Sequence, residues 1–194
     1  GLPNNLNSGL KEILNDNFDY IARMDADDVC VNNRFLVQLS FLQQNPDVDV
    51  VGSWSTIIDS ESKIIGEKRV PEDINFEALT RSCNVIHPTL FFKREFFVKF
   101  GFYGGDYLKS QDWELWLRAV AQGGIMKNIQ QPLLNLRIVN NLVDRRRSEQ
   151  RFNRKIISFY STGIFKYIFI FRSWLIELLP SFILRYLVHR AYRK

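Results

Sequence analysis

The sequence predicts an α/β fold in which a mixed sheet is flanked by helices. Across residues 1–143, short runs of β-branched and aromatic residues, typical of strands, alternate with longer runs whose apolar residues follow helical spacing. A chain of 194 residues, 46% of them hydrophobic, can form one domain with a sizeable core, or one domain and an extension.

The first elements surround an acidic turn. Residues 11–14 close a short helix, and the apolar residues 19–24 form a buried strand. Asn32 or Asn33 can cap the next helix, which runs to about Gln44, where a proline stops it. Four apolar residues are expected on the buried face of this helix: Phe35, Leu36, Leu39 and Leu42.

The middle of the chain predicts two further strands and two helices. Residues 48–58 are rich in β-branched side chains and form a strand, followed by a polar turn at residues 59–62. A proline opens a helix over residues 71–81, residues 85–92 are strand-like, and a short helix then ends near Phe100.

A tryptophan-rich helix and two strands complete this part. The helix begins after Ser110 and is stopped by two glycines. Its core-facing stripe falls at helical spacing: Trp113, Trp116, Leu117 and Val120. The two strands, residues 125–129 and 133–139, lie on either side of Pro132.

The acidic turn is the first candidate site. Asp25, Asp27 and Asp28 occupy three of four positions where the strand 19–24 should end. Carboxylates this close repel one another unless a positive charge lies among them, and a hard divalent cation takes oxygen ligands. Ligands also bind at strand ends in open α/β sheets. The alternative is a solvated turn whose aspartates cap the next helix.

Asp112 is the second candidate. It lies at the start of the tryptophan-rich helix, behind a glycine-rich loop, where the helix dipole favours its charged form. An ionised carboxylate in that position is a plausible general base. A simple stabilising role in the first helical turn is the alternative.

The chain resembles the family 2 inverting glycosyltransferases of the bacterial surface-polysaccharide type, which have the GT-A fold. The resemblance covers roughly residues 1–138, and its segments run in the order of the family. They are residues 6–10, 20–28, 34–38, 41–46, 50–53, 87–89 and 111–118. It implies a GT-A-like mixed sheet flanked by helices.

The resemblance also implies the roles of individual residues. Asp27 would bind a divalent metal, Mn²⁺ or Mg²⁺, with Asp25 beside it facing the metal or the ribose of a nucleotide-sugar donor. Asp112 would take a proton from a hydroxyl of the acceptor, a saccharide or lipid-linked saccharide, in one inverting displacement. His87 and Trp113 would contact substrate.

Two neighbours of this motif receive other roles. Asp28 is expected to cap the following helix, and Arg23 to point away from the site.

The chain departs from the family pattern in three respects. Gln111 replaces a usual glutamate, and Val139 stands near the place where many members have a histidine. The first nucleotide-binding βαβ unit is missing, so we expect residues 1–143 to be the C-terminal portion of an N-terminally truncated GT-A domain. Whether such a chain binds donor or is active by itself is left open.

Residues 144–194 form a different kind of segment. They carry 12 Lys or Arg and 3 acidic residues, a net charge of +9, whereas residues 1–143 have a net charge of −4. Residues 164–192 are strongly apolar, with polar side chains at every fourth position: Ser173, Glu177, Ser181, Arg185 and His189. A basic amphipathic helical extension of this kind is typical of the membrane interface. The alternative is a helical hairpin that packs on protein.

This charge pattern and the two cysteines predict a location. Cys30 and Cys83 have no metal-ligand spacing and indicate a reducing compartment. We therefore expect a cytoplasmic enzyme, peripheral on the inner face of the cell membrane. The basic residues border apolar helices and are not interleaved with exposed aromatics on a folded face, which argues against nucleic acid as a partner.

Two other functions compete with glycosyl transfer. Residues 25–29 also fit the nucleophile motif of haloacid-dehalogenase-type phosphatases, although the tryptophan-rich helix has no place in that scheme. The basic extension would equally suit a non-catalytic membrane-binding fragment.

Overall fold

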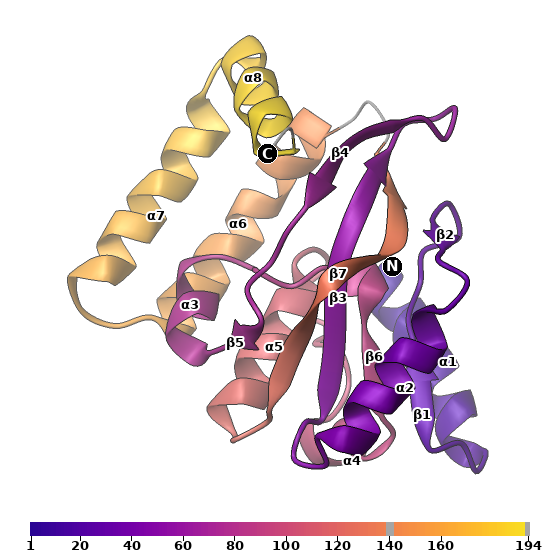
Figure 1. Cartoon of the computed structure of the whole chain (residues 1–194). Coiled ribbons are helices and arrows are strands. Elements are labelled where there is room, and N and C mark those ends of the chain that lie inside the picture. The colour runs from indigo at the N-terminus through magenta and orange to yellow at the C-terminus, as the bar shows by residue number, and fades with distance from the viewer. Residues whose placement is uncertain (139–141, 193–194) are drawn as a thin grey trace.

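A computed structural model describes residues 1–138 and 142–192, with side chains described to residue 187 except at Leu142. A mixed sheet lies at the centre, and helices cover both of its faces (Figure 1). Val139 and His189, both named in the sequence predictions, have side chains outside the described residues.

The sheet is built around one long parallel pair. β3 (Val50–Ile58) runs parallel to β7 (Met126–Arg137), and every other pairing among the described strands is antiparallel. The strand order is β1-β6-β3-β7-β2, with β4 beside β3 and β5 beside β7. The shorter strands are β1 (Tyr20–Ala22), β2 (Val29–Cys30), β4 (Ile64–Lys68), β5 (Asp73–Ile74) and β6 (Phe91–Lys93).

Alternation along the strands creates a core on each face. Ile21, Val50 and Phe92 belong to the larger cluster, whereas their chain neighbours Val51 and Phe91 belong to the smaller one. This is the period of two that a pleated strand imposes. β1 and β6 pair in register with Ile21 opposite Phe92.

The helices are distributed over these two cores. α2 (Arg34–Gln44) covers the smaller cluster through Leu42. The larger cluster lies under helices that contribute Leu10, Phe96, Trp116 and Ile156. These helices are α1 (Leu2–Asn15), α4 (Glu95–Phe100), α5 (Gln111–Ala121) and α6 (Leu142–Tyr160). The remaining helices are α3 (Phe76–Arg81), a 3₁₀ turn η1 (His87–Thr89), α7 (Gly163–Leu178) and α8 (Ser181–Tyr192).

The predicted mixed sheet flanked by helices is confirmed, but several boundaries differ. Residues 71–81 do not form one helix: β5 comes first, and α3 begins at Phe76, where the Asn75 side chain accepts a hydrogen bond from Ala78 N at 2.8 Å. Residues 85–92 form η1 before a short strand. The two strands predicted around Pro132 are one irregular strand, β7.

The buried face of α2 was predicted only in part. Leu42 is buried and Leu39 packs beside it as predicted, but Phe35 and Leu36 are exposed, and Arg34 and Gln38 are buried instead. Arg34 donates to Arg23 O at 2.8 Å, and Gln38 donates to Thr89 O at 2.7 Å. Backbone carbonyls at the ends of β1 and η1 need donors where water is excluded, so this helix buries polar side chains.

Candidate active site

The acidic turn follows β1 directly and brings three carboxylates together. Suitable ligand atoms of Asp25, Asp27 and Asp28 all lie within 4.8 Å of one another. A backbone hydrogen bond from Asp28 N to Asp25 O, at 3.3 Å, closes the turn. The predicted cluster at a strand end is therefore present.

Asp28 does not cap α2, contrary to the sequence prediction. Its side chain is buried, and Oδ1 accepts a hydrogen bond from Arg137 N at 2.8 Å. Oδ2 is also buried and has no hydrogen-bond partner among the described residues. Burial raises the pKa of Asp28 to about 6, against the Arg137 hydrogen bond, and the charges of Asp25 and Asp27 raise it further.

The cluster fits a divalent cation. Three carboxylates offer only oxygen atoms, the ligand type that Mg²⁺ and Mn²⁺ prefer. The unpartnered Oδ2 of Asp28 is a buried acceptor, and a cation would satisfy it. Asp25 and Asp27 remain the predicted ligands, and the structure adds Asp28 to the set that can reach the same ion.

Arg23 points into the site, contrary to the expectation that it points away. Its Nη2 lies 2.5 Å from Asp25 Oδ1, and its side chain is almost buried. The second guanidinium nitrogen, Nη1, is buried without a hydrogen-bond partner in the described part of the chain. The Arg23 charge lowers the pKa values of both Asp28 and Asp112, so it lies within electrostatic range of both candidate groups.

Arg137 anchors the acidic turn and was not found from the sequence. Besides its backbone contact with Asp28, its side chain donates to Asp27 O at 2.8 Å and to Asp59 O at 2.6 Å. It thereby joins the acidic turn to the turn between β3 and β4. A signal was present in the sequence: residues 136–139 stand where the family often has Tyr-Arg-x-His, and Arg137 matches the arginine of that pattern.

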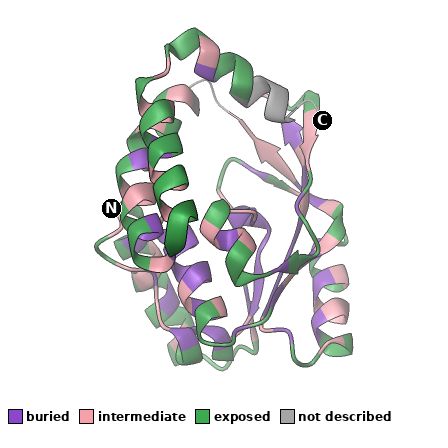
Figure 2. Cartoon of the chain, turned by 90° about the vertical axis from the view of Figure 1, so that its left-hand side faces the viewer, coloured by how far each residue is buried: buried purple, intermediate pink, exposed green. Residues whose placement is uncertain are grey.

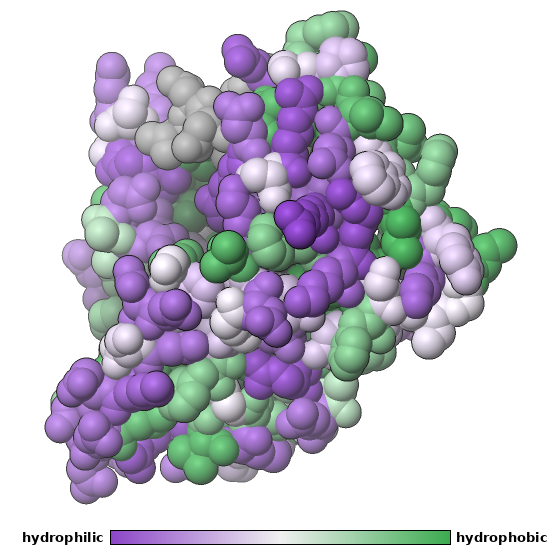
Figure 3. Space-filling model, turned by 180° about the vertical axis from the view of Figure 1, so that it is seen from behind, coloured by the Kyte–Doolittle hydropathy of each residue, from purple (hydrophilic) through white to green (hydrophobic). Residues whose placement is uncertain are grey.

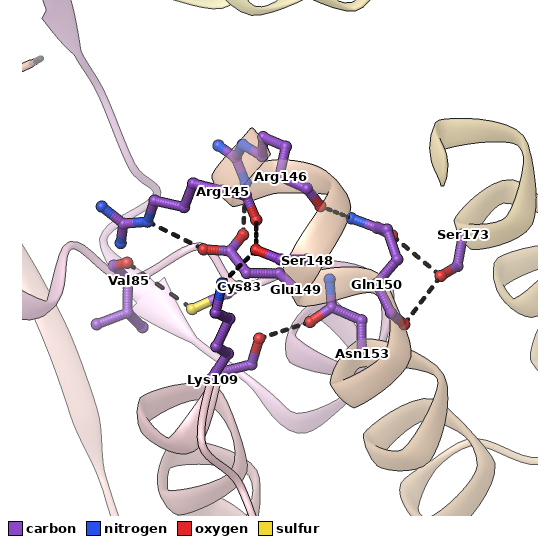
Figure 4. Close-up of polar contacts among 11 residues, drawn as sticks. Cys83, Val85, Lys109, Arg145, Arg146, Ser148, Glu149, Gln150, Asn153 and Ser173 are labelled. Carbon is purple, nitrogen blue, oxygen red and sulfur yellow. Dashed lines mark hydrogen bonds and ion pairs between the residues drawn. The ribbon is translucent and has the colours of Figure 1, made fainter. Parts of the chain in front are cut away.

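Asp112 lies in the first turn of α5, as predicted. Ser110 precedes the helix in the left-handed region, with φ of 58°, and its hydroxyl donates to Asn153 Oδ1 of α6 at 2.7 Å. Burial raises the pKa of Asp112, and the nearby Glu149 carboxylate adds to the rise. The hydrogen bond from Trp113 N and the Arg23 charge act in the opposite direction. Figure 4 shows Glu149 on α6, held by Arg145.

His87 is a buried neighbour of Asp112. Its Nδ1 lies 3.8 Å from Asp112 Oδ2, and its Nε2 lies 2.7 Å from the Tyr103 hydroxyl. Burial lowers the pKa of His87 well below its usual value, and Arg23 lowers it further, so the ring is neutral near pH 7. Asn7 of α1 holds the Tyr103 backbone through hydrogen bonds of 2.8 and 3.0 Å.

Trp113 occupies the core. Its side chain is buried, and its indole N–H donates to Leu79 O at 2.8 Å. A contact with substrate remains a prediction for this residue, and that contact would use only the small exposed part of the ring. The predicted stripe of α5 does pack inward: Trp116 and Leu117 are fully buried, and Val120 packs against the same cluster.

The sheet, its helices and the acidic turn define a GT-A-like α/β protein. Residues 1–101 match the sequence model of glycosyl transferase family 2, so the chain belongs to that family. This membership decides against the phosphatase alternative.

Named relatives agree with this assignment. The chain is 33% identical over 150 residues to the UDP-Gal:alpha-D-GlcNAc-diphosphoundecaprenol beta-1,3-galactosyltransferase of Escherichia coli, covering 75% of this chain and 52% of that protein. It is 32% identical over 152 residues to an uncharacterized glycosyltransferase of Haemophilus influenzae, covering 76% of this chain and 54% of that protein. The amylovoran biosynthesis glycosyltransferase AmsE of Erwinia amylovora is 29% identical, and the match covers 86% of this chain and 64% of that protein.

Solved structures share the fold. The crystal structure of S. aureus TarS residues 1–349 in complex with UDP-GlcNAc aligns with a TM-score of 0.53 at 10% identity, covering 88% of this chain and 49% of that one. At this identity the likeness shows the fold alone. The chain spans about half the length of the first curated relatives it matches.

Proposed function

We propose that the protein transfers a sugar from a nucleoside-diphosphate sugar to a hydroxyl of a lipid-linked saccharide, with inversion, in polysaccharide biosynthesis. One observation carries the proposal: Asp28, which has a buried carboxylate oxygen without a partner among the described residues, joins a three-carboxylate cluster within electrostatic reach of Arg23, which also acts on Asp112. Membership of glycosyl transferase family 2 supports the same reaction class.

The acidic turn would hold the donor. Asp25 and Asp27, with Asp28, would bind Mg²⁺ or Mn²⁺, and such an ion would neutralise charge on the departing nucleoside diphosphate. Arg23 has one guanidinium nitrogen engaged by Asp25 and one free of hydrogen bonds among the described residues. It offers a further positive charge at the same place.

Asp112 would act as the general base. Its carboxylate accepts the proton of the acceptor hydroxyl as that oxygen forms a bond to the anomeric carbon, and the bond from that carbon to the diphosphate oxygen breaks with its electron pair. A single displacement inverts the anomeric centre. Neutral His87 has Nε2 at the Tyr103 hydroxyl and Nδ1 toward Asp112, so a tautomer with its proton on Nδ1 would orient the base.

The names of the relatives support the proposed acceptor and location. The E. coli relative is named for an acceptor of GlcNAc-diphosphoundecaprenol, and two further E. coli relatives, both beta-1,3-glucosyltransferases, are named for the same acceptor with UDP-Glc as donor. A polyprenol anchor keeps its saccharide at a membrane surface. We therefore place the reaction on the cytoplasmic face of the cell membrane, with the sugar and linkage left open.

Two measurements test the proposal. Asp27→Ala should weaken Mn²⁺ binding to this chain, followed by calorimetry, while Asp47→Ala, an exposed aspartate outside the cluster, should not. Asp112→Asn should lower transfer from a UDP-sugar by about 10²–10⁴-fold with donor affinity little changed, since general-base catalysis contributes about that much. Transfer is measured on this chain and on any longer form of the protein.

Three outcomes would contradict the proposal. Transfer unaffected by EDTA would show that the reaction needs no metal. Full activity in Asp112→Asn would show that Asp112 is not the general base. Vesicle binding by a protein that binds neither Mn²⁺ nor donor in any form would support the non-catalytic membrane-binding fragment instead.

A further inference from the structure

Two polar side chains of α7 contact helix α6. Ser173 is 3% exposed, and its hydroxyl lies 3.0 Å from Gln150 Oε1 of α6 (Figure 4). Glu177, one turn further along, forms an ion pair with Arg154 of α6 at 2.6 Å. The two members of the polar stripe that lie on α7 therefore contact α6, whereas Ser181 and Arg185 of the same stripe are exposed on α8.

Many apolar side chains of α7 and α8 are exposed, although Phe169, Ile170 and Leu184 pack inward. The exposed side chains recur at helical spacing along one side, and the most exposed range from 64% to 75%: Ile164, Tyr167, Phe171, Leu178, Phe182 and Tyr186. Figure 3 shows hydrophobic side chains along the edge of the molecule that α7 and α8 form, and exposed residues predominate on that helical layer in Figure 2. A continuous apolar face of this kind marks an interaction site.

This face is held rigidly on the rest of the molecule. Phe169 and Ile170 of α7 pack against the main core cluster. The Arg147 side chain of α6 donates to Leu179 O between α7 and α8, and Leu184 anchors α8 by being buried. The outward face is therefore a fixed platform, which would set the orientation of the whole chain on its partner.

Charge identifies the partner. Residues 144–194 carry a net charge of +9, and Arg172 of α7 and Arg185 of α8 are exposed on the helices that carry the face. Two of the three acidic residues in this segment, Glu149 and Glu177, are already paired with arginines of α6. A second copy would oppose one such positive surface to another, whereas anionic lipid headgroups complement it.

Length limits how the helices meet a bilayer. Among the described residues no single helix is long and apolar enough to cross a bilayer. α7 together with residues 181–187 of α8 has the length and composition to do so, but the two helices are bent by 120° to each other. Helices with one apolar face and a basic border instead lie in the interfacial plane.

We propose that the outward face of α7 and α8 docks the protein on an anionic bilayer, with its apolar side chains at the headgroup–acyl boundary and with Ser173 and Glu177 against α6. This deepens the proposed function, because a lipid-linked acceptor would reach the site at that surface. The docking itself requires neither donor nor metal, so its failure and that of the proposed reaction can be told apart.

Vesicle flotation tests the docking. The chain should float with vesicles of phosphatidylglycerol and phosphatidylcholine, and less with phosphatidylcholine alone or at high salt. The triple variant Phe171→Ser, Leu178→Ser, Phe182→Ser should bind at least about tenfold more weakly, because each side chain loses its burial in lipid. The control is Leu36→Ser, Ile64→Ser, Val98→Ser, which removes three similarly exposed apolar side chains elsewhere and should bind as the parent does.

Trp174 provides a second readout. It is 49% exposed on α7, whereas Trp113 and Trp116 are buried. Brominated lipids should quench part of the tryptophan fluorescence, and Trp174→Phe should lose most of that quenching. Circular dichroism confirms that every variant is folded.

Three results would overturn the proposal. They are equal binding of the two triple variants, no flotation with anionic vesicles, and a stable dimer in sedimentation that only the α7–α8 variant disrupts. The last would assign the face to a second copy.

Discussion

Helices α5 and α7 both carry a tryptophan-containing apolar stripe, yet they turn it in opposite directions. In α5, Trp116 and Leu117 are fully buried against the sheet. In α7, Phe171 faces outward and Trp174 is half-exposed over the Arg154 guanidinium of α6, while Ser173 is buried. The difference teaches that helical periodicity shows that a helix has an apolar face, but not whether protein covers that face.

The environment of each helix explains the contrast. α5 lies on a sheet whose facing side chains, such as Phe92 and Val50, are apolar. α7 lies on α6, which offers Gln150 and Arg154 at the contact. Buried polar groups require partners, so the stripe that matches α6 in polarity is the one that turns inward.

A matched pair of phenylalanine truncations should show the largest difference. Phe96→Ala removes a ring that is fully buried and packed against Phe92 and Trp116, and should lower the free energy of unfolding by about 3–5 kcal/mol. Phe171→Ala removes a ring that is 64% exposed and should change it by less than about 0.5 kcal/mol. Urea unfolding in the absence of lipid measures both. Similar losses in the two variants would show that the α7 face is covered by protein.

The buried histidine near Asp112 should make stability depend on pH. The pKa of His87 is depressed by folding, so the unfolded chain binds a proton below pH 6.5 that the folded chain does not. Stability from this group is complete above pH 6.5 and is lost as pH falls below it, by at most about 1.4 kcal/mol per pH unit. Unfolding free energies between pH 7 and 5 should fall more steeply for the parent than for His87→Gln. Parallel curves would mean that the ring is protonated in the folded state.

Truncation of Ser173, which faces α6, should change the free energy of unfolding least among the three predictions. Ser173→Ala leaves Gln150 Oε1 with one partner fewer in a buried place and should cost about 1 kcal/mol. Ser158→Ala, an exposed serine at the end of α6, is the control and should be nearly neutral. A neutral Ser173→Ala would indicate that the α6–α7 contact is loose, and chemical denaturation resolves the two cases.

Sequence reasoning found the parts of the candidate site that are consecutive in the chain. The three aspartates and the start of α5 are local features, so their types and spacing could be read directly. The roles of Arg137 and Tyr103 were not predicted, because they depend on contacts with Asp28 and His87, which are distant in the sequence. Arg23 was assigned the wrong direction for the same reason: the ion pair with Asp25 depends on how the strand end bends.

The buried face of α2 shows a different limit. Apolar residues were expected inside, but Arg34 and Gln38 take those positions, because carbonyl groups at the ends of β1 and η1 need donors. The positions of such carbonyls are set by strand pairing, and pairing is not encoded in the helix itself.

By itself, the sequence determined the mixed α/β class, the acidic turn after β1, the inward stripe of α5 and the basic apolar C-terminal helices, because each depends on residue type and local period. Only the tertiary structure decided that the Asp28 side chain is buried in the acidic cluster, that His87 lies between Tyr103 and Asp112, and that α7 exposes apolar side chains such as Phe171. These depend on which surfaces meet, and a side chain turns toward the partner that satisfies it.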